Sequence, residues 1–251
     1  MHKLPQTVDE VIAVLDDIID DNVLHKNYNA VFAYVYRRTT IEIKTAIERG
    51  DFEDAEEMEK FDVYFANLYI KAYYDYREAS PLSISWATTI KAGEEKLTLI
   101  QHVLLGMNAH INFDLGKTAA HMAKGKEIDT LQNDFRKINE ILVSLTNEIQ
   151  SKLSSVSPLL FLLDLIGGNR DEKIANFSIK IAREQSWNFA KNLWTKEEIE
   201  QGLLIEEVDN RVSKLAKKLI NPSTIILNTI LKIIKVFEQK SIEQTILALR
   251  K

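Results

Sequence analysis

Glycine and proline are scarce in this chain, whose 251 residues include only eight glycines and four prolines. A typical protein of this length has more than twice as many, since the two residues make up about 12% of average sequences. So few helix breakers leave room for long helices and little for the turns that a hairpin-rich sheet needs. The sequence therefore predicts an all-α fold.

Capping signals and apolar spacing place the helices. Two capping-box patterns, at residues 7–10 and 195–198, mark helix starts, whereas Gly50 and Ser80-Pro81 mark helix ends. Helices are predicted over residues 7–25, 28–49, 51–79, 94–115, 130–153, 159–166, 171–193 and 195–219, with a short segment around Trp86 and one or two helices after Asn221-Pro222. No repeat or linker divides the chain, so residues 1–251 are predicted to form one domain, a multi-helix bundle of about nine to eleven helices.

Composition and charge exclude several classes of function. The chain contains no cysteine, which removes disulfides, zinc ribbons and thiol nucleophiles. Its net charge of −5 predicts that it does not bind nucleic acid, because neutralising phosphates needs clustered Lys and Arg. The start of the chain lacks the apolar run of a signal peptide, so a cytoplasmic location is expected. The apolar stretch 225–237 is too short to span a bilayer, and we expect it to pack on the core rather than on a membrane.

Residues 101–116 combine apolar and polar side chains unusually closely. Five polar residues, His102, Asn108, His110, Asn112 and Asp114, lie among leucine, methionine, isoleucine and phenylalanine. Polar and apolar residues alternate over 108–114, which is typical of a strand, but both flanks favour a helix. The neighbours are too apolar to face water, so we expect the five polar side chains to be mostly buried and hydrogen-bonded.

On a helix, His110 and Asp114 share one face because they are four residues apart. A second candidate lies in the helix predicted over 51–79, where Asp62 is set within an apolar run. A buried carboxylate needs a cation or several donors, and Arg183 lies between apolar neighbours that suit the core. We therefore expect His110 to form one polar cluster with Asp62 or Asp114, reached by Arg183 or by a tyrosine of the helix over 51–79.

The same residues resemble a known family. Residues 58–69, Trp86 and residues 101–116, followed by Asp134-Phe135 with Asn139 and by Arg183 with Trp187, resemble a bacterial family catalogued as domain of unknown function 5995. The resemblance covers roughly residues 5–220. It implies no reaction, but it supplies candidate catalytic residues, His110, Asp114 and His102, and candidate binding residues, Asp62, Asn67, Tyr69, Trp86, Asn108, Asn112, Arg183 and Trp187.

The sequence leaves three functions open. In the first, the cluster binds or converts a small-molecule ligand, with His110 as a base oriented by Asp114 and with Arg183 for an anionic group. In the second, the protein is a metal-dependent hydrolase in which His102, His110 and Asp114, with Asp62 as a further candidate, hold a divalent metal ion. In the third, the protein is a non-catalytic helical scaffold, and the polar residues form a structural network. The oligomeric state is not indicated.

Overall fold

The computed structural model describes residues 3–163, 179–239 and 241–251. Its α-helices are α1 (Val8–Leu24), α2 (Asn29–Arg49), α3 (Ala55–Arg77), α4 (Ile84–Ala92), α5 (Leu99–Ala109), α6 (Leu115–Met122), α7 (Gln132–Val156), α8 (Ile179–Trp194), α9 (Glu198–Ile220), α10 (Ile225–Phe237) and α11 (Ile242–Leu249). A π-helical turn, η1 (His110–Asp114), and two 3₁₀ turns, η2 (Ile128–Leu131) and η3 (Leu160–Leu163), complete the described elements. These ranges contain no strand, so the predicted all-α, multi-helix fold is confirmed.

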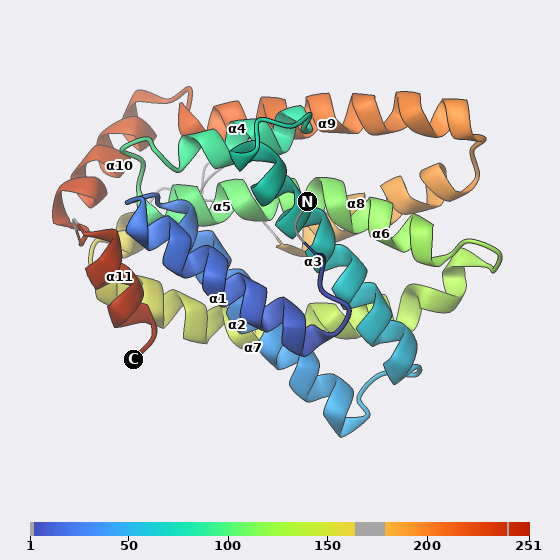
Figure 1. Cartoon of the computed structure of the whole chain (residues 1–251). Helices are drawn as coiled ribbons and strands as arrows, with labels where there is room; N and C mark the ends of the chain where they lie inside the picture. The colour runs from blue at the N-terminus through green and yellow to red at the C-terminus, as the bar shows by residue number, and fades with distance from the viewer. Residues whose placement is uncertain (1–2, 164–178, 240) are drawn as a thin grey trace.

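The segment from α5 through η1 to α6 runs through the middle of the bundle (Figure 1). It contacts α2 on one side and α4 and α9 on the other, while α8 lies along α6 and η1. Helices α1 and α2 pack along each other, and α7 lies against α2. The motif that stood out in the sequence therefore lies at the centre of the fold, where every side of it is covered.

The prediction of one helix over 94–115 is wrong in its ends and in its regularity. Helix α5 begins only at Leu99, and the chain passes without interruption through the wider π turn η1 into α6. Gly116, which was expected to end the helix, lies inside α6 instead, because α8 packs there. A Cβ atom at Gly116 would be 2.4 Å from Cδ1 of Phe189 and 2.9 Å from the carbonyl oxygen of Ser186.

Helix caps also differ in part from the prediction. The hydroxyl of Thr7 accepts from the backbone N–H of Glu10 at 3.2 Å, as predicted. Thr195 does not cap α9, because α8 continues to Trp194 and the Thr195 hydroxyl donates to the carbonyl of Asn192. A complete capping box, formed by Thr98 and Gln101, starts α5 and was not predicted.

Other boundaries shift for local reasons. Helix α3 begins at Ala55 rather than at residue 51, because Asp54 caps it by accepting from the Glu57 N–H at 2.9 Å. The predicted helix over 159–166 is a 3₁₀ turn in its described part. Residues 164–166 of this prediction, and residues 171–178 of the helix predicted over 171–193, lie outside the described residues.

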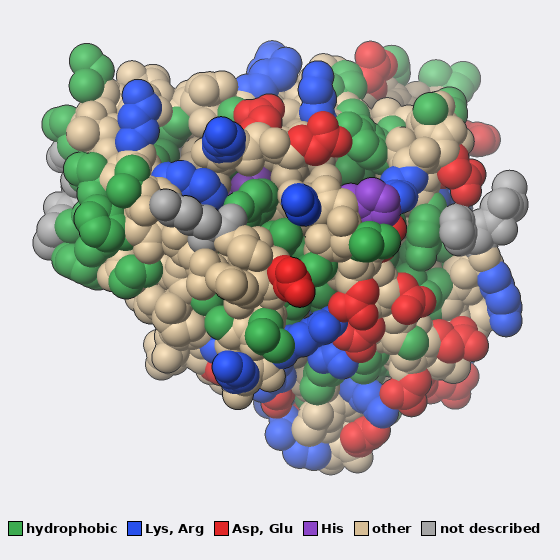
Figure 2. Space-filling model, turned by 60° about the vertical axis from the view of Figure 1, so that its left-hand side comes forward, with side chains coloured by type: hydrophobic (Ala, Val, Ile, Leu, Met, Phe, Trp, Pro, Cys, Tyr) green, Lys and Arg blue, Asp and Glu red, His purple; other side chains and the backbone are tan. Residues whose placement is uncertain are grey.

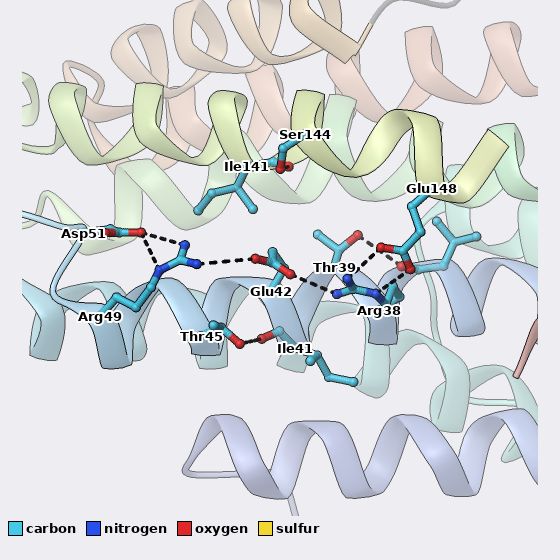
Figure 3. A network of polar contacts seen from close by, with 11 residues as sticks. Arg38, Thr39, Ile41, Glu42, Thr45, Arg49, Asp51, Ile141, Ser144 and Glu148 are labelled. Carbon is cyan, nitrogen blue, oxygen red and sulfur yellow. Dashed lines mark hydrogen bonds and ion pairs between the residues drawn. The ribbon is translucent and has the colours of Figure 1, made fainter. Parts of the chain in front are cut away.

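Ion pairs fix α2 beside α7 (Figure 3). Arg38 on α2 donates from Nε and Nη2 to the two carboxylate oxygens of Glu148 on α7, at 2.8 and 2.7 Å. The chain of contacts continues along α2 through Glu42 and Arg49 to Asp51. These side chains are partly exposed, so each ion pair is expected to contribute no more than about 1 kcal/mol to stability.

No single helix in the described ranges is long and apolar enough to cross a membrane. Helices α9 and α10 meet that criterion only when taken together, and the chain bends by 67° between them.

Candidate functional site

The π turn η1 brings His110 and Asp114 together. Nδ1 of His110 lies 3.3 Å from Oδ2 of Asp114, and that oxygen also accepts from the indole N–H of Trp86 at 2.8 Å. Nζ of Lys117 lies 3.3 Å from the other carboxylate oxygen. Asp114 is only 1% exposed, yet it has donors on both oxygens and a cation beside it. The predicted contact between His110 and Asp114 is confirmed.

The imidazole of His110 is packed among aromatic rings. It stacks on Phe65 with centroids 3.6 Å apart and meets the edge of Tyr36 at 4.5 Å. Burial lowers the pKa of His110, although Asp114 opposes part of that effect. The ring is therefore neutral at physiological pH, and with Nδ1–H donating to Asp114 its Nε2 is a hydrogen-bond acceptor. Within the described residues, that Nε2 has no hydrogen-bond partner.

His110 also lines a cavity of about 330 Å³ between α2, α5, α7 and α8. Most of its walls are aliphatic and aromatic side chains, namely Phe32, Val35, Ile43, Phe65, Ile100, Val103, Leu104, Met107, Ile111, Ile138, Leu142, Ile149, Leu153, Leu160, Leu163 and Ile179. The polar residues on the walls are few: Tyr36, Thr39, His110, Thr146, Gln150 and Arg183. An apolar cavity with a few polar groups is the usual form of a small-molecule site.

Arg183 is the charged residue of this cavity. It comes from α8 and is 2% exposed. Its Nη2 donates to the carbonyl oxygen of Phe135 at 2.8 Å, and its guanidinium lies 4.2 Å from the centre of the Phe135 ring. Burial lowers the pKa of Arg183 to about 9. Among the side chains that the structure describes, no carboxylate forms an ion pair with it, and its Nε has no hydrogen-bond partner.

Burial of the central motif was predicted correctly for most of its polar residues. His102, Asn108, His110 and Asp114 are buried, and Asn112 is half-buried. The proposed role of Arg183 as the partner of Asp62 or Asp114 is wrong, because its guanidinium is held by the Phe135 carbonyl instead. Arg183 shares the cavity wall with His110 rather than a hydrogen bond with a carboxylate.

His102 lies apart from the pair formed by His110 and Asp114. Its ring stacks on Tyr28 with centroids 5.2 Å apart, and burial together with Lys235 lowers its pKa to about 3. It is therefore a neutral ring packed against another part of the fold. Across the described ranges, no group of three or more His, Asp or Glu side chains is placed to hold a metal ion. The geometry gives the proposed metal site of His102, His110 and Asp114 no support.

Several other candidates make contacts within the fold. Asn112 donates to Asn108 at 3.0 Å, and Asn108 donates to the carbonyl of Val212 at 3.0 Å, which ties η1 and α5 to α9. Asn67 donates to the carbonyl of Pro5 at 2.9 Å. Tyr69 stacks on Trp86, and Trp187 packs on Phe135, with centroids 5.1 and 4.8 Å apart. None of these residues lies on the cavity walls.

Sequence reasoning missed Tyr36 and Phe65, which flank His110 on the cavity wall. Tyr36 is 6% exposed, and its hydroxyl has no hydrogen-bond partner within the described residues. Neither residue stood out in the sequence as a site residue, because both belong to apolar runs of the kind that any core helix has. A tyrosine hydroxyl in such a run needs a hydrogen-bond partner when it is buried. This requirement is the one feature that distinguishes Tyr36 from its apolar neighbours.

Asp62 supports a prediction about pH. It is 2% exposed, and burial, with a smaller contribution from Glu59, raises its pKa to about 7. The Asp62 carboxyl ionises near pH 4 in the unfolded chain and near pH 7 in the folded protein, so its own contribution to stability falls as pH rises between these values, whereas the lowered pKa values of His102 and His110 act in the opposite direction. We expect Asp62→Asn to remove this loss, which amounts to at most about 1.4 kcal/mol per pH unit. Urea unfolding of both proteins at pH 5 and pH 7 measures it.

The control for this prediction is Asp129→Asn at an exposed position, which should leave the pH dependence of the wild type unchanged. Equal pH dependence in the wild type and in Asp62→Asn would show that the Asp62 carboxyl is ionised in the folded protein.

The chain was also compared with known proteins and protein families. Neither the curated proteins nor the solved structures contain a match to the chain. The model of a family described as a family of unknown function, DUF5995, matches residues 8–222. That range includes the pair of His110 and Asp114, the cavity and Arg183. The resemblance seen in the sequence is thus confirmed, and the chain belongs to the DUF5995 family.

Proposed function

We propose that this protein binds a small, largely apolar molecule that carries one anionic group, and that this group is held by Arg183. One observation carries the proposal. The guanidinium of Arg183 is buried in the wall of an apolar cavity, and it forms no ion pair with any carboxylate in the described part of the chain. Buried charges in proteins are normally paired, because removing an ion from water costs several kcal/mol.

The chemistry of the site defines the ligand further. A carboxylate or similar anion offers oxygens that match the planar guanidinium, whose Nε–H is not used within the described fold. Nε2 of His110 accepts a hydrogen bond, and the hydroxyl of Tyr36 can donate or accept one, so a ligand with a hydroxyl group beside its anion fits as well. The aliphatic remainder of the walls disfavours sugars and nucleotides, whose many polar groups would be left without partners.

A matched pair of ligands tests the proposal. Isothermal titration calorimetry would compare a medium-chain fatty acid with the primary alcohol of the same chain length. We expect the fatty acid to bind more tightly by about tenfold to a hundredfold, because a charge-assisted hydrogen bond to a buried group contributes about 1.5–3 kcal/mol. Arg183→Met should remove most of this difference while keeping the apolar contacts.

Arg136→Met is the control variant, because Arg136 is an exposed arginine on α7. It should bind both ligands as the wild type does. Equal affinity of the wild type for acid and alcohol would contradict the role of Arg183, and failure to bind either ligand would contradict a site in the cavity.

Catalysis at the same cavity is the second candidate, and the contact between His110 and Asp114 favours it. A histidine whose Nδ1–H is held by a buried carboxylate presents Nε2 as a base in a fixed orientation. If the site is catalytic, His110→Gln will retain ligand binding and lose turnover. If it is a binding site alone, mass spectrometry of ligand incubated with the wild type will recover the ligand unchanged.

A further inference from the structure

One end of the molecule, where α9 turns into α10, exposes many apolar side chains. The outward side of α10 presents Ile225, Ile226, Ile233, Val236 and Phe237, of which Ile225 is 84% and Phe237 is 59% exposed. The opposite side of the same helix packs on the core through Leu227, Leu231 and Ile234. We call the five exposed residues the α10 face. The helix is thus apolar on both its inner and its outer side.

The stretch of chain that forms the α10 face and the end of α9 carries only basic charges. Residues 210–237 contain six basic residues and no acidic residue, although the whole chain has a net charge of −5. Five of the six are exposed, namely Arg211, Lys214, Lys217, Lys218 and Lys232. Figure 2, which brings the α10 end of Figure 1 forward, shows hydrophobic side chains gathered on the left with Lys and Arg side chains beside them.

We infer that the α10 face, with the basic residues around it, docks this protein on the surface of an anionic lipid bilayer. An amphipathic helix with large apolar residues lies in the plane of a bilayer with those residues among the acyl chains. Basic residues beside it are attracted by anionic headgroups, at about 1 kcal/mol for each Lys or Arg close to the surface. Docking of this kind needs no membrane-spanning segment, so the short length of α10 is no obstacle to it.

A second copy of the chain fits this surface less well. In a two-fold symmetric contact, the same patch meets itself. The α10 face would then bring Lys217, Lys218 and Lys232 of one copy close to the same lysines of the other. Like charges in such a contact repel one another, whereas an anionic bilayer satisfies both the apolar side chains and the lysines.

The position of α10 relates this surface to the cavity. Helix α10 packs against η3, and Leu160 and Leu163 of η3 lie on the cavity wall. A docked molecule therefore holds its cavity near the lipid phase, which is a source of apolar ligands with an anionic group. The docking inference rests on the exposed side chains alone and does not depend on what the cavity binds.

Vesicle flotation of the full chain tests the inference. We expect the protein to float with vesicles of phosphatidylcholine mixed with phosphatidylglycerol, and to remain unbound with phosphatidylcholine alone. Val236→Asp combined with Phe237→Asp should abolish flotation. Lys217→Gln combined with Lys218→Gln should weaken binding by about tenfold or more. The control, Ile199→Asp with Leu203→Asp, places two charges at exposed apolar positions in the first part of α9 and should float as the wild type does.

Circular dichroism of each variant would verify the fold, since all the changed residues are exposed. No flotation of the wild type, or flotation that the change at Val236 and Phe237 leaves intact, would overturn the inference. It would also be overturned by a concentration-dependent dimer in analytical ultracentrifugation that this double change dissociates, because the α10 face would then bind a second copy.

Discussion

Gly106→Val should destabilise the protein by about 3 kcal/mol or more, which is at or above the usual cost of adding atoms to a packed core. A Cβ atom at Gly106 would lie 2.1 Å from Cγ of Phe32, far inside van der Waals contact. Phe32 cannot easily move away, because its ring meets those of Tyr69, Trp86 and His110. Denaturant unfolding, followed by circular dichroism, gives the change in the free energy of unfolding.

Gly202→Val is the matched control for this prediction. Gly202 also lies inside a helix, α9, but a Cβ atom there meets nothing within 4 Å. Valine is a slightly better helix former than glycine, so the control should be neutral or weakly stabilising. Equal stabilities of the two variants would mean that Phe32 and α5 can move apart without cost, and that the aromatic cluster around His110 is loosely packed.

The presence of the helices could be predicted because it depends on local properties of the sequence. Scarce glycine and proline and the apolar spacing were sufficient for the all-α class, as α1, α2 and α9 show. The π turn η1 could not be predicted from its own residues, and in the fold it lies against α8 and α9, which come much later in the chain. The alternation over 108–114 did mark this segment as irregular, although the irregularity is a widened helix and not a strand.

The site could be predicted only in its local part. His110 and Asp114 were joined correctly, because four residues of separation bring two side chains to one face of a helix. The cavity that His110 lines depends on side chains from α2, α5, α7 and α8, and a void between four helices leaves no pattern in any one of them. Arg183 was correctly predicted to be a core residue, because its neighbours in the sequence are apolar. Its hydrogen-bond partner, the carbonyl oxygen of Phe135, was not predicted.

His102 shows the limit of such reasoning most clearly. It lies on the same continuous helical segment as His110 and is equally buried. Its ring stacks on Tyr28, which is far away in the sequence. Nothing in residues 101–116 predicts this contact. Residue type and burial could therefore not separate a histidine of the cavity from a histidine that only packs.

Asp114→Ala should lower the free energy of unfolding by about 2–5 kcal/mol, because each buried donor that loses its charged acceptor costs about 1–3 kcal/mol. The change would leave the indole N–H of Trp86 and Nδ1 of His110 without their acceptor, and it would leave Lys117 without its nearby carboxylate. It also leaves a space in a part of the core that is otherwise filled. Unfolding in urea would measure this loss.

Two further variants separate the charge of Asp114 from its hydrogen bonds. Asp114→Asn keeps an oxygen that can accept from Trp86 but cannot balance Lys117, so it should cost less than Asp114→Ala. Asp17→Ala, at an exposed position of α1, should change stability by no more than about 0.5 kcal/mol. If Asp114→Ala and Asp17→Ala cost the same, Asp114 does not hold His110 in place. The orientation of His110 in the cavity wall would then depend on Phe65 and Tyr36, whose rings enclose it.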